Sequence, residues 1–385
     1  MAKLGDICFQ ITDGSHNPPV GIENSKHLML SSKNVNDDEI TTTAPRFLTD
    51  EQFDLENKRT NVLSGDLLMT IVGTVGRVAI VPEALAGICL QRSVAVIKPN
   101  PTIINNRYLM YQLRSMRKFL ESEARGVAQK GIYLKKVSDL SVITPPLDEQ
   151  YRVVDTLDRI SSLIHIYQQQ LTKLDELVKA RFVEMFGDII SNSNQWPTYK
   201  LSEITSSRLG KMLDTKQQTG THRYPYLANF NVQWFRFELE TLNSMDFSES
   251  DRIEFELRDG DLLVCEGGEI GRCAVWHNNV QPCYFQKALH RVRCDKTFIL
   301  PDFLAWWFRY NCDHGGFSAI EGAKATIAHL PGAKLKNLNV CVPPLPLQNQ
   351  FAAFVEEVDK SKVEVQKALD QTQLLFDSLM QQYFG

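Results

Sequence analysis

Two glycine-bearing segments contain residue types that could cradle a phosphate. They are Gly73-Thr74-Val75-Gly76-Arg77 and Gly267-Gly268-Glu269-Ile270-Gly271-Arg272. Neither fits the G-x-x-x-x-G-K-[ST] pattern of nucleotide hydrolysis, and each lies between two short apolar runs. A tight hairpin is therefore the better interpretation. Each hairpin would still place one arginine where it could contact DNA.

Two other segments invite a comparison with DNA-modifying enzymes. Asn17-Pro18-Pro19-Val20 looks like the Asn-Pro-Pro-aromatic motif of amino-methyltransferases, but valine stands where an aromatic ring must stack on the flipped base. Glu56-Asn57-Lys58 has the Glu-x-Lys spacing of many nucleases, without a strand pattern around it or a counterpart later in the chain. No nucleophile and base form a recognisable pair. We therefore expect no catalytic residues.

The cysteines and the composition exclude further classes of protein. None of the eight cysteines forms a C-x-x-C pair, and Cys312-Asp313-His314 has no partner pair at metal-ligand spacing, so we expect buried thiols and no metal site. The chain is 43% hydrophobic and 23% charged, as in ordinary globular proteins. No apolar run reaches the roughly 18 residues of a membrane span, and the start lacks a signal-peptide core. We expect a cytoplasmic protein without a membrane partner.

Positive charge is concentrated locally, although the formal net charge is −4. Residues 84–120 contain no Asp or Glu, and neither do residues 271–294. The first zone contains Arg92, Lys98, Arg107, Arg114, Arg117 and Lys118, and the second contains Arg272, Lys287, Arg291 and Arg293. Local fields matter more than total charge for nucleic-acid binding. We predict that these zones face DNA phosphates.

The chain repeats itself at a nearly constant separation. Short motifs recur in the same order, which chance does not readily produce. Gly65-Asp66-Leu67-Leu68 recurs as Gly260-Asp261-Leu262-Leu263, Gly76-Arg77 as Gly271-Arg272, Gln91 as Gln286, Pro145-Pro146-Leu147 as Pro343-Pro344-Leu345, Gln150 as Gln348, and Phe186-Gly187 as Phe384-Gly385. The sequence therefore predicts two homologous units.

A heptad pattern follows each double proline and predicts a long helix. Such a helix from 148 to 186 would be roughly 58 Å long at about 1.5 Å per residue. The predicted seam comprises Val153, Leu157, Ile160, Ile164, Leu171 and Val178, and in the second unit Phe351, Val355, Val358, Val365, Leu369 and Phe376. Lys362 and Thr372 interrupt the second pattern. Two such stripes can bury each other in an antiparallel pair, whereas two helices packed separately on their own modules are the alternative. Leu163, Ile166, Leu177 and Phe182 are expected on the exposed face.

Each unit also contains a globular module of mixed structure. In the first, 67–72, 78–81 and 94–97 are predicted strands and 106–125 a helix. In the second, 262–265, 273–276 and 289–292 are predicted strands and 301–312 a helix that begins with proline. A polar link at 191–196 separates the units.

The order of these features resembles the specificity subunit of type I restriction-modification enzymes over essentially the whole chain. The matching features are Thr12-Asp13-Gly14-Ser15-His16-Asn17-Pro18, the Gly-Asp-Leu-Leu and Gly-Arg turns, the Pro-Pro-Leu-x-x-Gln helix starts and the Phe-Gly endings. The second unit lacks the Asp-Gly-Ser-His segment and has Leu209-Gly210-Lys211-Met212-Leu213-Asp214 instead, which leaves a shared role for this loop in doubt.

The resemblance implies an α+β fold with two α/β target-recognition domains separated by two long antiparallel coiled-coil helices, in a pseudo-twofold internal repeat. The expected segments are recognition domain 1 (1–145), a central helix (146–190), recognition domain 2 (191–342) and a C-terminal helix (343–385). The resemblance further implies a non-catalytic subunit that binds double-stranded DNA, two methylation subunits and two restriction subunits. S-adenosylmethionine, ATP and magnesium would belong to those partners.

Such a subunit would read a bipartite, asymmetric target, with one half-site for each module. Phosphate contacts would supply salt-dependent affinity, and loop donors and acceptors would read base edges. In the first module the candidate contacts are Ser15, His16, Lys33, Arg77, Gln91, Arg92 and Lys130. In the second module they are Lys211, Arg223, Arg272, Gln286, Lys287, Arg291 and Lys324. Two alternatives stay open: a two-headed scaffold that never binds DNA, and a nuclease or methyltransferase with an unrecognised site.

Overall fold

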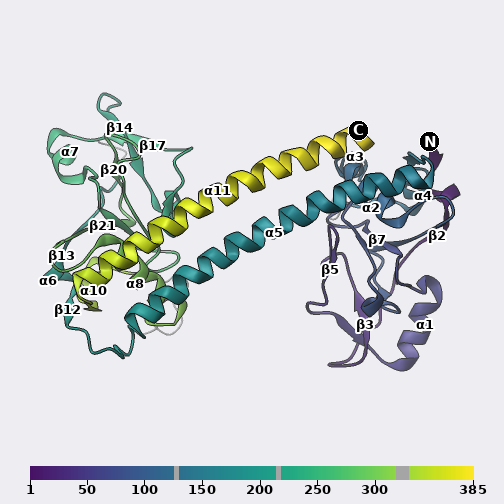
Figure 1. The fold of residues 1–385 in the computed structure, drawn as a ribbon, viewed down its shortest axis with the longest axis horizontal. Coiled ribbons are helices and arrows are strands. Elements are labelled where there is room, and N and C mark those ends of the chain that lie inside the picture. The colour runs from purple at the N-terminus through teal and green to yellow at the C-terminus, as the bar shows by residue number, and fades with distance from the viewer. Residues whose placement is uncertain (125–129, 214–217, 318–328) are drawn as a thin grey trace. The chain divides into compact units, whose positions relative to one another are not determined.

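The computed structural model describes residues 1–124, 130–213, 218–317 and 329–385. The chain divides into two compact units (Figure 1). The first comprises Met1–Gln169 with Gln366–Gly385, and the second comprises Gln170–Val365. Each unit therefore contains one globular module and a part of each of the two long helices, α5 (Leu147–Phe186) and α11 (Leu345–Phe384).

An antiparallel four-stranded sheet forms the centre of the first module. Its order is β2-β10-β7-β8, with β2 Cys8–Asp13, β10 Val94–Pro99, β7 Leu67–Thr70 and β8 Val78–Ile80. All four side chains of β7 are buried, which explains why Leu67, Leu68 and Met69 form an apolar run rather than an alternating pattern. The predicted strands and the hairpin between β7 and β8 are confirmed; Gly73 and Gly76 of that turn have φ of 85° and 88°.

Smaller elements surround this sheet. A second sheet joins β6 (Arg46–Leu48), β3 (His27–Leu30) and β9 (Cys89–Leu90), with β3 parallel to β9. Two further pairs are β1 (Ala2–Lys3) with β11 (Ser141–Val142) and β4 (Val35–Asn36) with β5 (Glu39–Ile40). The helices are η1 (Leu4–Ile7), α1 (Asp50–Thr60), η2 (Glu83–Leu85), α2 (Asn106–Ser115), α3 (Arg117–Glu123) and α4 (Leu134–Ser138).

The prediction of one helix over 106–125 is wrong. The structure has α2 and α3 with a break at Met116, whose φ and ψ are −80° and 1°. The hydroxyl of Ser115 donates to the carbonyl of Gln112 at 2.8 Å. Such a bond back to the preceding turn competes with the helical ladder and favours a bend.

The second module repeats this topology strand for strand. Its main sheet has the order β13-β21-β18-β19, with β13 Thr205–Leu209, β21 Leu289–Cys294, β18 Leu262–Cys265 and β19 Cys273–Val275. The smaller sheet joins β17 (Asn243–Asp246), β14 (Arg223–Leu227) and β20 (Tyr284–Phe285), again with one parallel pair, β14 and β20. The internal duplication and the α+β class are therefore confirmed.

The remaining elements of the second module, apart from η4, also have counterparts in the first. β12 (Thr198–Lys200) pairs with β22 (Asn339–Cys341), and β15 (Val232–Gln233) pairs with β16 (Arg236–Phe237). The helices are α6 (Leu201–Ile204), η4 (Asn229–Asn231), α7 (Glu249–Phe255), α8 (Pro301–Asp313) and α10 (Gly332–Lys336).

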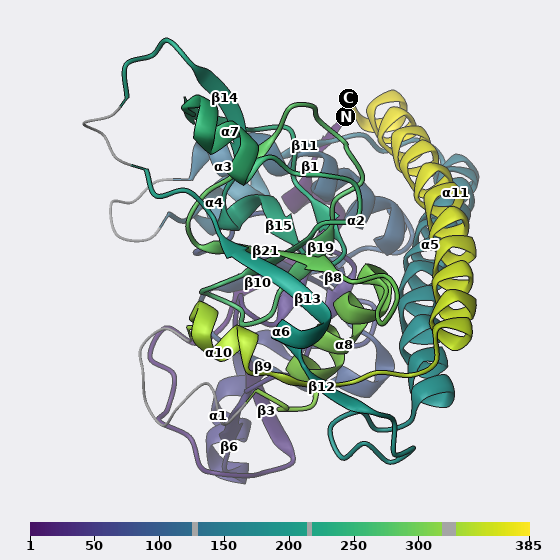
Figure 2. The ribbon, with the colours of Figure 1, turned by 90° about the vertical axis from the view of Figure 1, so that its left-hand side faces the viewer.

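Both long helices contribute to the core of each unit, and within each unit they lie side by side (Figure 2). In the first unit, Phe376 and Phe384 of α11 make ring contacts with Tyr111 and Tyr108 of α2 at 6.1 and 5.2 Å between centroids. Packing of each helix on its own module alone is therefore excluded, since the end of α11 packs on the first module.

The second unit shows the direction of the pairing. The ring centroids of Phe182 on α5 and Phe351 on α11 are 5.4 Å apart, and Asp175 Oδ1 forms an ion pair with Lys362 Nζ at 2.7 Å. The partner of the earlier residue on α5, Asp175, is the later residue on α11, Lys362. The two helices are therefore antiparallel in this unit. The ion pair also explains why a lysine interrupts the apolar stripe.

The predicted seam residues all lie on the protected side of their helices. Seven are buried: Val153, Leu157, Ile160, Val178, Phe351, Val358 and Phe376. The other five are half-buried: Ile164, Leu171, Val355, Val365 and Leu369. On the opposite face, Leu163, Ile166 and Leu177 are 44–47% exposed. The expectation that Phe182 is exposed is wrong, because its ring packs between Phe303 of α8 and Phe351 and is only 1% exposed.

A buried glutamine ties the first turn of each long helix to its module. In the first unit, the Gln150 side chain accepts from Asn105 N at 2.7 Å and donates to Ile103 O and Pro145 O at 3.0 and 2.8 Å. Gln348 makes the same three bonds in the second unit, with Leu300 N at 2.8 Å, Phe298 O at 3.0 Å and Pro343 O at 2.8 Å. Both side chains are completely buried.

Gln348→Ala should lower the free energy of unfolding of the second unit by about 3 kcal/mol, because it removes three hydrogen bonds to backbone groups, each worth about 1 kcal/mol. All five tryptophans lie in this unit, so the urea midpoint followed by tryptophan fluorescence reports on it. Gln350→Ala, at an exposed position of the same helix, is the control. Equal midpoints for the two variants would show that the buried glutamine does not stabilise this unit.

Candidate nucleic-acid interface

The segment that follows β2 passes across the end of β9, and backbone hydrogen bonds hold the two segments together. We call this place the crossing. Ser15 N donates to Leu90 O at 2.7 Å, and Arg92 N donates to Ser15 O at 2.9 Å. Ser15 and Gln91 form an isolated parallel bridge. Three predicted contact residues, Ser15, Gln91 and Arg92, therefore meet at one place on the first module.

The second module has the same arrangement with other side chains. Lys211 N donates to Phe285 O at 3.2 Å, Lys287 N donates to Lys211 O at 2.8 Å, and Lys211 forms the bridge to Gln286. The backbone of Leu209-Gly210-Lys211 therefore makes the same hydrogen bonds as the backbone of Asp13-Gly14-Ser15. The two segments share this structural role although the second module lacks the Asp-Gly-Ser-His sequence. The recurrence of Gln91 as Gln286 has a structural reason, because both residues belong to this crossing.

A close approach of two chains explains the shared glycine. A Cβ atom on Gly14 would lie 2.1 Å from Leu90 O, and one on Gly210 would lie 2.3 Å from Gln286 O. Both obstructing atoms belong to backbone that is hydrogen-bonded in the crossing. Any side chain larger than hydrogen would therefore force the two segments apart.

Gly210→Ala should destabilise the second unit by about 2–3 kcal/mol through this steric overlap. Tryptophan fluorescence during urea unfolding measures the loss. Gly332→Ala is the matched control, because its nearest neighbour, His290 Cε1, would be 3.5 Å away, an ordinary contact. A variant at position 210 as stable as the control would show that the crossing is not tight.

A buried acid in the first module presents two nitrogen donors to solvent. Asp13, 6% exposed, contacts His16 Nε2 at 2.8 Å through one carboxylate oxygen and Arg59 Nη2 through the other. The side chains of His16 and Arg59 are 53% and 52% exposed. Arg59, in the last turn of α1, was missed by the sequence analysis because nothing in the sequence links it to Asp13.

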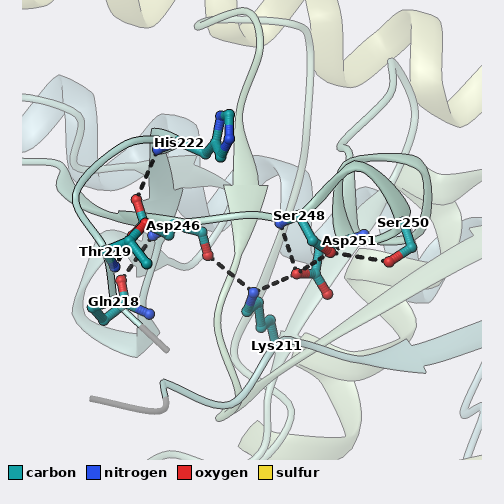
Figure 3. Close-up of polar contacts among 8 residues, drawn as sticks. All are labelled: Lys211, Gln218, Thr219, His222, Asp246, Ser248, Ser250 and Asp251. Carbon is teal, nitrogen blue, oxygen red and sulfur yellow. Dashed lines mark hydrogen bonds and ion pairs between the residues drawn. The ribbon is translucent and has the colours of Figure 1, made fainter. Parts of the chain in front are cut away.

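A different polar network occupies the corresponding place in the second module (Figure 3). Lys211 Nζ pairs with the carboxylate of Asp251 and donates to Asp246 O at 2.9 Å. Burial opposes ionisation of Asp251, but the contacts with Lys211 and Ser248 outweigh it and lower the pKa of this carboxyl. The Lys211 side chain is only 13% exposed. Its charge is therefore used inside the module, and we leave it out of the proposed DNA contacts.

Several other predicted contacts are engaged within their own modules. Arg77 donates to Asn36 Oδ1 at 3.0 Å, Arg272 to Asn229 O at 3.1 Å, and Arg291 to Glu254 O at 2.7 Å. All three are half-buried. The arginine that recurs after each glycine turn thus fastens that turn to its neighbour.

The remaining predicted contacts that the structure describes are Ser15, Gln91 and Gln286, which are half-buried at the crossing, and six exposed residues. The exposed ones are His16, Lys33, Arg92, Lys130, Arg223 and Lys287. Among the residues that the structure describes, Arg92 and Lys287 form no ion pair, and they occupy equivalent positions of the crossing. Lys324 lies outside the described residues.

Several cations of the acid-free zones are paired with acids of their own module, which leaves fewer of them available for the predicted contacts with DNA phosphates. Arg107 contacts Asp38 and Asp158, at 3.0 and 2.5 Å, and Arg117 contacts Asp37 at 2.7 Å. Lys98 pairs with Asp66 and, in the second module, Arg293 pairs with Asp261. The acids that neutralise these cations are distant in sequence and near in space, so a linear charge count could not find them.

The two segments compared with enzymes lie in unsuitable places. Val20 is 96% exposed in a loop, and Glu56-Asn57-Lys58 lies on α1 rather than on a strand. Within residues 1–124, 130–213, 218–317 and 329–385, no group of three or more His, Cys, Asp or Glu side chains could hold a metal ion. In the same residues, no helix is both long enough and apolar enough to cross a membrane.

Comparison with known proteins agrees with this architecture. The model of one family, described as the type I restriction modification DNA specificity domain, matches residues 23–176 and 193–372. The chain is 27% identical over 197 residues to the type I restriction enzyme EcoBI specificity subunit of Escherichia coli; the match covers 49% of this chain and 40% of that protein. The chain spans less than two thirds of the length of this and the next two curated relatives.

Two solved structures share the fold over 100% of this chain. The type I restriction-modification S subunit from M. genitalium superimposes with a TM-score of 0.57 at 13% identity, covering 95% of that chain. A structure described as the basis of complex assembly and conformational transition of the type I R-M system gives a TM-score of 0.60 at 16% identity, covering 96% of that chain. The chain therefore belongs to the type I restriction-modification DNA specificity family and carries the family domain twice.

Proposed function

We propose that this chain is the non-catalytic DNA-recognition subunit of a type I restriction-modification complex. Each module reads one half of an asymmetric, bipartite target. The observation that carries this proposal is the crossing repeated in both modules, where an identical set of backbone bonds supports different side chains. A common backbone gives both modules the same mode of docking, while different side chains give each its own half-site.

Partner binding is assigned to the long helices. Exposed apolar side chains recur on the outer faces of both helices, with Leu163, Ile166 and Leu177 on α5 and Val363 and Leu374 on α11. Apolar groups left in water favour a protein partner. We propose that two methylation subunits dock there and that two restriction subunits join the complex. The description of one structural neighbour, which refers to complex assembly of the type I R-M system, supports an assembly with partners.

The chemistry of such a complex would reside on the partners. S-adenosylmethionine would bind the methylation subunits, and ATP with magnesium would bind the restriction subunits, in the cytoplasm where these subunits meet DNA. This chain would supply the sequence specificity of the complex. Mapping methylated sites in the host genome with and without the chain tests the proposal, since loss of one asymmetric motif is the expected result.

Footprinting with the methylation partner separates the proposal from its alternatives. Two protected patches support a DNA reader, whereas no protection supports a scaffold. Turnover of DNA by the purified chain with magnesium and S-adenosylmethionine would instead show an unrecognised active site.

Lys287→Ala should weaken binding of the assembled complex to its target and reduce the slope of log K against log [salt] by about 0.9, the loss of one phosphate contact. Arg92→Ala should do the same from the first module. Titration at several salt concentrations gives the slope. Lys296→Ala is the control because Lys296 is exposed just beyond the opposite end of β21. An unchanged slope for both test variants would place the crossing away from DNA.

A further inference from the structure

The loop that follows the crossing has nearly the same length in both modules and almost nothing else in common. Counted to the residue whose carbonyl binds the glutamine of the crossing, it is one residue longer in the second module (Gly210 to Leu227) than in the first (Gly14 to Leu30). It spans 14–26 between β2 and β3, and 210–222 between β13 and β14. Aligned from their first residues, the two segments share only the initial glycine. A fixed anchor and a nearly constant length with an unrelated sequence are what a pair of modules needs to read two different half-sites.

A single carboxylate holds the described part of the second loop (Figure 3). One oxygen of Asp246 accepts from Thr219 N at 2.5 Å, Gly220 N at 2.6 Å and Thr219 Oγ1 at 3.1 Å, and the other accepts from His222 N at 3.1 Å. The backbone N–H of Asp246 in turn donates to Gln218 Oε1 at 2.8 Å. Burial opposes ionisation of Asp246, yet the bonds from Gly220, His222 and Thr219 outweigh it and lower the pKa of this carboxyl.

The two ends of the loop are fastened to the same residue. Lys211, which follows the anchoring glycine, donates to Asp246 O at 2.9 Å, while the carboxylate of Asp246 binds the residues just before β14. Asp246 itself pairs with Arg223 across β17 and β14. The position of the loop relative to the sheet is therefore set by Asp246.

These bonds turn the loop backbone toward Asp246. The side chains of Gln218 and Thr219 also bond to Asp246, and Arg223 donates to Ser244 O at 3.2 Å, whereas no bond to Asp246 from the side chain of Thr221 or His222 is seen in the described residues. The side chains of Thr219, Thr221, His222 and Arg223 are exposed, and Asp246 is 7% exposed beneath them. Hydroxyl, imidazole and guanidinium groups are donors and acceptors that can pair with base edges in the major groove.

The first module holds its loop from the equivalent strand by other means. Arg46 of β6 donates to Pro19 O at 2.5 Å, and Ile22 N donates to Phe47 O at 3.0 Å. β6 and β17 occupy the same place, each beside the strand that follows the loop. Support of this loop by the neighbouring edge strand is thus common to both modules, whereas the supporting groups differ.

We propose that the segment Gln218–Arg223 contacts the bases of the second half-site in double-stranded DNA and that Asp246 is its positioning residue. This inference rests on the proposed function. Asp246→Asn should impair it, because an amide nitrogen would face backbone N–H donors in place of one accepting oxygen. The loop would then shift while the sheet beneath it is retained.

The test uses the full chain assembled with its methylation subunits, on duplexes carrying the genomic motif or single base changes in either half. Asp246→Asn should reduce discrimination in the second half-site by about tenfold, the value of one good base contact, and leave the first half-site unchanged. His222→Ala and Thr221→Ala, at exposed positions, should produce the same one-sided loss without affecting folding.

Matched controls lie at the opposite edge of the main sheet. Asp259 and His277 form an exposed contact of 3.5 Å beyond β19, so Asp259→Asn and His277→Ala should behave as the unmodified chain. Unchanged discrimination in all three loop variants, or an equal loss in both half-sites, would overturn the assignment of the loop. Absence of sequence-specific binding by the unmodified complex would instead overturn the proposed function.

Discussion

The buried glutamine at the start of each long helix is the constraint on which the rest of each unit depends. A long helix needs a fixed origin on its module, and the buried side chains of Gln150 and Gln348 provide it, because each forms hydrogen bonds with three backbone groups. The angle at which the helix leaves the module is thereby fixed. Both units repeat the same three bonds, so any partner docked on the helix meets its module in the same way.

The crossing beside Gly14 and Gly210 has the same role for the recognition surface. Its bonds are made by backbone atoms, which every residue possesses, and only the glycine is required by the space available. The side chains that follow are consequently free to change. Asp13 in the first module and Asp246 in the second both use a buried carboxylate to orient exposed donors, but from different strands. Equivalent positions can therefore be served by unrelated groups.

Most of the fold followed from the sequence, since recurring motifs and heptad spacing are linear signals. The duplication, the sheet strands and the long helices were predicted on this basis. The break at Met116 and the burial of Phe182 were not predicted, because the helical period carries no information on either contact. The break goes with a hydroxyl that bonds to the preceding turn, and Phe182 is buried in an aromatic cluster with α8.

The site was harder to predict for a related reason. Cations that looked available in the sequence, such as Arg107 and Arg117, are paired with acids far along the chain, whereas Arg59 acquires its place only through Asp13. Charge spacing along the sequence does not encode these pairings. A shared backbone does leave a trace, however, in the nearly equal lengths of two loops with unrelated residues. If each module reads its own half-site, as proposed, the recognition element is expected where the duplicated units agree in geometry and disagree in side chains.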